Sequence, residues 1–187
     1  VMGKPKEAIA AAQRATALRR QYLPDDVFEQ AVSLRNLGDA YLGDGDHDHA
    51  RRNYEQAIAA FKKVDITDQV QAIDALVASI GLARALNAQA QYAAALRTVD
   101  DATAFADRQG LAADWDGRAV LLSLKATAQK PLGDAAGALA SFRQATDIAG
   151  RIYGVDNPAL VNGHIGIGGA LNDLGRPREA LEAYARA

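Results

Sequence analysis

A spacing of twelve residues between small side chains recurs four times along this chain of 187 residues. A glycine or alanine is followed twelve residues later by an alanine in the pairs Gly38–Ala50, Ala83–Ala95, Ala126–Ala138 and Gly168–Ala180. Four residues after each of these alanines stands a larger side chain, namely Tyr54, Val99, Phe142 and Tyr184. The second half of one more copy is given by Ala8, Ala12 and Ala15. The residues that precede the alanines by five positions indicate turns: Gly3, Gly45, Ala90, Gly133 and Gly175.

Several positions that keep this register through five copies indicate a repeat protein, because alanine alone is too common here to be informative. A glycine or alanine in one helix lets the alanine of the next helix approach closely. The larger side chain one turn later then fills the space between neighbouring hairpins. Each hairpin buries its apolar face on its neighbour, so stability grows with repeat number. The sequence therefore predicts an all-α protein of stacked helical hairpins.

These positions resemble the tetratricopeptide repeat, and the resemblance covers nearly the whole chain. It implies one domain over residues 1–187, a right-handed α-solenoid of antiparallel helical hairpins. The four to five repeats would cover about residues 1–21 (partial), 26–63, 68–108, 112–152 and 158–187. The usual proline after the second helix is missing, Gln129 replaces a large apolar residue, and Val99 replaces an aromatic one.

The repeat period is longer than that of the common tetratricopeptide repeat, which is about 34 residues. The alanines at positions 8, 50, 95, 138 and 180 lie 42 to 45 residues apart. HEAT and armadillo repeats have similar periods, but the glycine and alanine positions and the short Gly-Asp turns argue against them. The stretch from Tyr153 to Leu160 resembles the Gly-x-Asp-His-Pro linker of long repeats in kinesin light chains and bacterial signalling proteins, with Asn157 in place of His. The opening Leu34–Gly38 resembles theirs as well.

The pattern predicts nine helices over about residues 5–21, 26–43, 47–63, 68–88, 92–108, 112–130, 135–152, 158–173 and 177–187. Asp26 with Glu29 and Asp68 with Gln71 fit capping boxes at two helix starts. Asn157 followed by Pro158 fits a third helix start. Because both chain ends fall inside a predicted hairpin, we expect a segment of a longer protein.

The composition argues against several other classes of protein. The formal net charge is −2, without the basic block that a nucleic-acid phosphate backbone requires. The chain has no cysteine, so it offers no disulfide or thiolate metal site, which fits a cytoplasmic protein. No apolar run approaches the roughly 18 residues that span a bilayer. We therefore expect neither nucleic acid nor a membrane as a partner.

Two local clusters suggest ligand chemistry at first sight. The stretch from Asp44 to His49 alternates acids as a calcium loop does, and Glu55 follows at the matching distance. His49, however, stands where such a loop needs glycine, so we expect a solvated turn with an acidic helix start. His47 and His49 would catch a transition metal only adventitiously. The glycines between Gly163 and Gly169 lack a preceding strand and a Lys-Ser/Thr pair, so a helix with small packing residues is expected instead of a phosphate loop.

No catalytic constellation is present in the sequence, so we expect neither an enzyme nor a cofactor or metal site. Proteins that this chain resembles bind peptides or helices in an inner groove lined by the first helix of each hairpin. Helical spacing assigns eleven residues to this predicted groove: Arg35, Asn36, Asp39, Ile80, Arg84, Asn87, Ser123, Thr127, Lys130, Asn162 and Asn172. Ile165 and Asp173 lie on the same predicted face. Asparagine and arginine can bond a ligand's backbone without reading its sequence.

The leading hypothesis is a protein-interaction scaffold within a larger signalling or regulatory protein, with a peptide or helix as its partner. Two alternatives stay open at this point. One is a self-assembly module that forms a homo-oligomer through its exposed end helices. The other is a sensor domain that regulates an attached enzyme.

Overall fold

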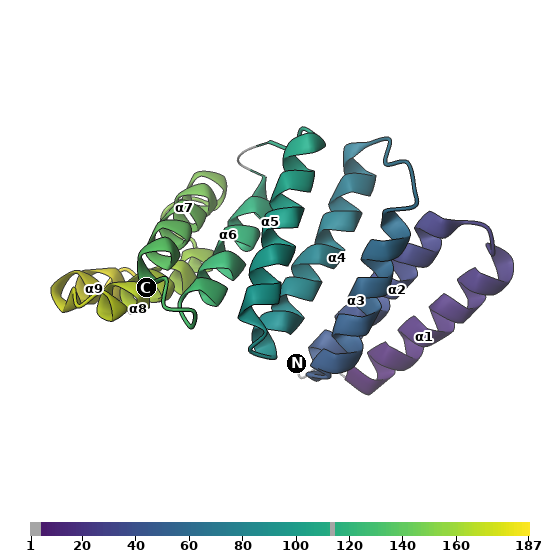
Figure 1. Ribbon diagram of the computed structural model, residues 1–187, viewed down its shortest axis with the longest axis horizontal. Coiled ribbons are helices and arrows are strands. Elements are labelled where there is room, and N and C mark those ends of the chain that lie inside the picture. The colour runs from purple at the N-terminus through teal and green to yellow at the C-terminus, as the bar shows by residue number, and fades with distance from the viewer. Residues whose placement is uncertain (1–4, 113–114) are drawn as a thin grey trace. The chain divides into compact units, whose positions relative to one another are not determined.

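The computed structural model describes residues 5–112 and 115–187, and within these ranges it contains helices and no strand (Figure 1). In chain order the helices are α1 (Pro5–Tyr22), α2 (Val27–Asp44), α3 (His47–Phe61), α4 (Gln69–Ala88), α5 (Tyr92–Arg108), α6 (Asp116–Gln129), α7 (Ala135–Tyr153), the short 3-10 helix η1 (Pro158–Leu160), α8 (Val161–Asp173) and α9 (Pro177–Tyr184). The all-α prediction is confirmed, and so is the order of the helices along the chain.

The chain divides into two compact units, Val1–Ala90 and Gln91–Ala187. This boundary lies between α4 and α5, which the sequence assigned to the same repeat. That both units form one domain over residues 1–187 stays a prediction, and each unit is described separately below.

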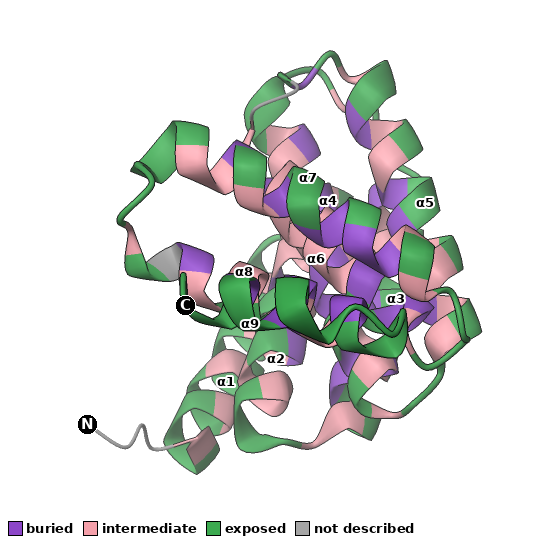
Figure 2. Ribbon diagram, turned by 90° about the vertical axis from the view of Figure 1, so that its left-hand side faces the viewer, coloured by how far each residue is buried: buried purple, intermediate pink, exposed green. Residues whose placement is uncertain are grey.

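The first unit contains α1 to α4, in which each helix packs on the next and α4 also contacts α2. Its centre is the Tyr54 ring from α3, which is fully buried together with Ala50 and Ala57 of the same helix. By contrast, α1 has no buried residue (Figure 2). It is tied to α2 by polar contacts instead, since Arg19 forms a 3.0 Å ion pair with Glu29.

The second unit contains α5 to α9, and its helices also pack in chain order. One apolar cluster joins α6, α7, α8 and α9 through Ala126, Ala138, Leu139, Phe142, Ile167, Ala170, Leu171, Ala180 and Ala183. Three of the small residues that mark the repeat are therefore core residues of this cluster. The predicted packing role of these positions is confirmed within this unit.

The predicted turn position has a distinctive backbone conformation. Gly45, Ala90, Gly133 and Gly175 all have a left-handed φ, between 57° and 83°. Gly3, the fifth member of this set, lies outside the described residues. The conformation lets each helix end sharply before the next one begins, and it favours glycine because a side chain is strained there.

The helix boundaries differ from the expected ones at a few ends. The predicted helix over 112–130 begins only at Asp116, because the preceding Trp115 has an extended backbone. The first turn of the predicted helix over 158–173 is the 3-10 helix η1. The predicted caps are confirmed at Asp26, which accepts from the Glu29 backbone N–H, and at Asp68, which accepts from that of Gln71.

The helix α4 is long and apolar enough to be compared with a membrane span, which the sequence analysis did not expect of any segment. By length and composition alone, its 20 residues could cross a membrane. Half of the apolar window is buried inside the protein, however, and Asp74 in this helix bonds Arg35 of α2. A core helix of this kind passes the same length test, so the finding is only weak support for a membrane span.

Candidate functional site

A polar network joins three helices on the face formed by α2 and α4 in the first unit. The Tyr54 hydroxyl of α3 donates a 2.6 Å hydrogen bond to Asp39 of α2. Arg35 lies 3.6 Å from the Asp39 carboxylate and 3.2 Å from that of Asp74 in α4. Because each of these four side chains is held by at least one other, the face is ordered before any partner arrives.

Two glycines allow the Tyr54 ring to occupy this position. A Cβ built on Gly38 of α2 would come within 2.8 Å of the ring, and one built on Gly81 of α4 within 2.3 Å. Both separations are shorter than real Cβ contacts, so any side chain at either position would displace the ring. The ring therefore sets the distance between α2 and α4.

The electrostatics keep the Tyr54 hydroxyl protonated. Burial raises its pKa well above the ordinary value, and the hydrogen bond to Asp39 and the charge of that carboxylate raise it further. Arg84 and Arg35 oppose this shift only in part. Tyr54 thus donates to Asp39 and holds this carboxylate in the network.

The predicted groove residues of the first unit differ in their access to solvent. Asn36, Asp39 and Arg84 are exposed, and Asn87 is half-buried. The Arg35 side chain is only 17% exposed, because the two carboxylates hold it against the surface. Ile80 is only 8% exposed and packs in the core, so little of its side chain is accessible, and its assignment to the groove stays a prediction.

In the second unit, the predicted groove residues lie on α6 and α8. Lys130, the residue that follows α6, forms a 3.3 Å ion pair with Asp173 of α8, which links these two helices. Asn172 donates a 3.2 Å hydrogen bond to the Tyr184 hydroxyl of α9. Asn162 is exposed, as is the neighbouring Ile165.

Two further groove candidates, Ser123 and Thr127, lie on α6. Their hydroxyls bond backbone carbonyls of the preceding turn, those of Ala119 and Ser123 respectively. Each hydroxyl has thus donated its proton within the helix, so only its acceptor capacity is left for a ligand. That the two sets of residues line one continuous groove stays a prediction.

The turn from Asp44 to His49 is a helix junction, as expected. Asp46 accepts a 3.0 Å hydrogen bond from the His49 backbone N–H and so caps α3. The imidazole of His49 lies 2.7 Å from the other Asp46 oxygen and stacks on Tyr41. Within the part of the chain that the structure describes, no group of three or more His, Cys, Asp or Glu residues could hold a metal ion.

The glycine-rich segment is the helix α8, as the sequence predicted, and its glycines have neighbours that explain them. A Cβ at Gly166 would lie 2.6 Å from the Phe142 ring, and one at Gly168 would lie 2.4 Å from that of Tyr184. Gly163 is equally close to the Thr146 hydroxyl. These glycines allow α8 to approach α7 and α9 rather than to cradle a phosphate.

Sequence reasoning missed two parts of the site. Asp74 bonds Arg35 across 39 positions, and no local pattern indicates such a pair. The other missed part is the glycine of the following hairpin that contacts each aromatic ring, Gly81 at Tyr54 and Gly166 at Phe142. The sequence does contain a signal for these glycines. Gly81 and Gly166 each stand two residues before the repeat position occupied by Ala83 and Gly168.

Comparison with known proteins supports this architecture. Residues 1–63 match the tetratricopeptide repeat family. BtubC from P. vanneervenii has 18% identity and a TM-score of 0.76, over 97% of this chain and 72% of that one. A putative kinesin light chain from Podosopora anserina has 20% identity and a TM-score of 0.76, over 98% of this chain and 85% of that one. No curated protein matches the chain.

A third solved structure is a Rap protein complexed with Competence and Sporulation Factor. It has 19% identity and a TM-score of 0.74, over 98% of this chain and 49% of the Rap chain. At such identities the likeness shows the fold alone. Residues 1–63 thus match the tetratricopeptide repeat family, and the chain as a whole has the fold of such repeat proteins.

Proposed function

We propose that this chain is a non-catalytic scaffold that binds a segment of a partner protein on the faces formed by α2 and α4 and by α6 and α8. The observation that carries the proposal is the ordered network of Tyr54, Asp39, Arg35 and Asp74. It fixes a polar surface that leaves Asn36 and Arg84 exposed beside it. An ordered surface binds with a smaller entropic penalty than a mobile one.

The charge distribution favours a partner that is bound through its backbone rather than through a terminal carboxylate. Arg35 is engaged by Asp39 and Asp74, and Lys130 is engaged by Asp173. A carboxylate ligand would have to displace these acids from Arg35 and Lys130, which leaves Arg84 as the exposed cation of the α2 and α4 face. The exposed amides of Asn36 and Asn162 can instead donate to and accept from a peptide group at the same time.

Proteins with a similar sequence or fold also support the proposed scaffold function. Tetratricopeptide repeats are typically non-catalytic binding scaffolds, and the similar Rap protein has been solved with Competence and Sporulation Factor bound. A role in signalling and a cytoplasmic location stay predictions, as do the two alternatives of self-assembly and of regulating an attached enzyme.

An affinity capture with two matched variants tests the proposal. Asn36→Glu/Arg84→Glu changes the charge by −3 on the face formed by α2 and α4, where both residues are exposed. Gln56→Glu/Arg52→Glu makes the same change on the exposed side of α3. Arg35 is left unchanged, because a glutamate there would face Asp39 and Asp74 and destabilise the unit.

We expect the wild type and the α3 variant to retain the same protein from the source lysate, and the variant on α2 and α4 to lose it while keeping a native circular dichroism spectrum. Equal capture by all three would reject the α2 and α4 face as the binding site.

A further inference from the structure

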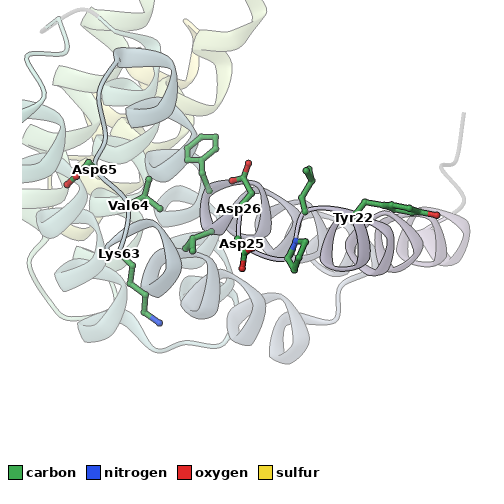
Figure 3. Close-up of a pocket in the computed structure, with 10 residues that line it drawn as sticks. Tyr22, Asp25, Asp26, Lys63, Val64 and Asp65 are labelled. Carbon is green, nitrogen blue, oxygen red and sulfur yellow. The ribbon is translucent and has the colours of Figure 1, made fainter.

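An open hollow of about 720 Å³ lies at the end of the first unit, between the α1–α2 turn and the chain that follows α3. Figure 3 shows Lys63, Val64 and Asp65 on one side and Tyr22 on the other, with Asp25 and Asp26 between them. The hollow lies away from the proposed groove face. Arg35 is eight residues beyond Val27, which is about 12 Å along the axis of α2.

The lining of the hollow is largely apolar and accessible. Tyr22 is 70% exposed, Leu23 45% and Val27 37%. Phe28 also lines the hollow, and its ring packs edge-on against Phe61 with 5.5 Å between the ring centroids. Contiguous apolar side chains at the surface mark contact sites more often than single ones do.

The charged residues of the lining are mainly acidic, with Asp25, Asp26 and Asp65 against one lysine, Lys63. Asp26 is already occupied, since it accepts the backbone N–H of Glu29 at the start of α2. The side chains of Asp25 and Asp65 take part in no hydrogen bond or ion pair with the residues that the structure describes. Two carboxylates therefore border an apolar hollow without an ion-pair partner among the described residues.

We propose that this hollow binds a second segment of a partner protein, a short peptide in which lysine or arginine stands beside large apolar side chains. The apolar side chains would cover Tyr22, Leu23 and Val27, while the cations would pair with Asp25 and Asp65. Such a contact combines hydrophobic burial with charge complementarity, so it discriminates against acidic and against purely polar peptides.

Three blocked synthetic peptides probe the hollow directly: acetyl-Leu-Lys-Phe-Arg-Leu-amide, its analogue with Glu in place of Lys and Arg, and its analogue with Gly in place of Leu and Phe. Binding is followed by the NMR methyl signals of Leu23, Val27 and Val64. We expect saturable shifts with the first peptide, binding at least tenfold weaker with the other two, and weaker binding at higher salt.

Two double variants locate the contact. Asp25→Asn/Asp65→Asn is expected to weaken binding of the first peptide at least fivefold. Asp101→Asn/Asp156→Asn removes two exposed carboxylates from the second unit and should leave binding unchanged. Asn36→Glu/Arg84→Glu should also leave it unchanged, which separates this hollow from the proposed groove.

The proposal is overturned if millimolar peptide gives no saturable shift, if the glutamate peptide binds equally well, or if Asp25→Asn/Asp65→Asn has no effect. It is also overturned if the same methyl signals shift with protein concentration in the absence of peptide. The occupant would then be a second copy of this chain.

Discussion

Two glycines, Gly38 and Gly81, enclose the Tyr54 ring, and Gly81 leaves less space for a side chain than Gly38 does. Helix propensity alone would make Gly81→Ala stabilising by nearly 1 kcal/mol. Its Cβ, however, would lie 2.3 Å from a carbon of a fully buried ring that Gly38 blocks on the other side. Overpacking of this kind costs about 1–3 kcal/mol, so we expect a net loss of up to about 2 kcal/mol in the free energy of unfolding, measured with urea.

Gly43→Ala is the matched control for this change. Gly43 lies in α2, and a Cβ there would meet nothing within 4 Å. We expect Gly43→Ala to raise the free energy of unfolding by about 0.5–1 kcal/mol, because alanine has a higher helix propensity than glycine. If Gly81→Ala also stabilised the protein, the contact between Tyr54 and α4 would be looser than described.

Ala90 is the one residue other than glycine with a left-handed φ, 57°, within the described ranges. The left-handed conformation costs an L-residue about 1–2 kcal/mol, which glycine avoids, although glycine is also more flexible in the unfolded chain. We therefore expect Ala90→Gly to raise the free energy of unfolding by about 0.5–1 kcal/mol in thermal or urea unfolding.

Gly133 occupies the same turn position with φ 83°, and a Cβ there would meet nothing. Gly133→Ala should therefore lower the free energy of unfolding by about 1 kcal/mol, through the left-handed backbone conformation alone. A stabilising effect of Gly133→Ala would contradict the strain assigned to this turn position.

At the scale of the element, the start of α3 depends on the charge of Asp46. The hydrogen bond from the His49 backbone N–H is the main cause that lowers the pKa of Asp46 below its ordinary value of 3.8. A lowered pKa in the folded state means that the stabilisation is complete above the ordinary pKa. It is lost as the pH falls through the lower, folded-state value.

Asp46→Asn keeps a capping side chain but removes this titration. We expect the wild type to be more stable than Asp46→Asn at pH 7, and the difference in urea midpoint to shrink progressively below pH 4. A difference that stayed constant between pH 7 and pH 2.5 would show that the charge of Asp46 has no part in stabilising α3.

The elements also show how far the sequence alone could go. Repeat positions such as Ala50 and Ala138 predict which helix faces are buried, because each lies at a fixed distance from a turn residue. The same spacing assigned Ile80 to the groove, at the position equivalent to Arg35. No spacing rule predicts that the Ile80 side chain is only 8% exposed, whereas the Arg35 side chain reaches the carboxylates of Asp39 and Asp74.

Other features depend on contacts between distant parts of the chain. Gln129 replaces an apolar residue yet is buried, because its amide donates to Asp134 and accepts from Ser141. The pairing of Arg35 with Asp74 likewise needs α2 and α4 to be side by side. The fold was therefore predictable from local periodicity, whereas the polar detail of the candidate site was not.

At the scale of the whole molecule, both units present the same kind of surface. The face formed by α2 and α4 is ordered by Arg35 and Asp74, and the face formed by α6 and α8 by Lys130 and Asp173. Each links neighbouring first helices of hairpins through an ion pair. This repetition within each unit supports the proposed scaffold function, because repeat proteins build their binding surfaces from equivalent positions of successive repeats.

Hydrogen exchange of the chain with and without its captured partner tests this claim most directly. The account predicts that the partner slows amide exchange in α2, α4, α6 and α8, and that exchange in α3 and α7 changes little. Protection confined to α3, α7 or α9, with α2 and α4 unaffected, would contradict the claim that the first helices form the binding surface.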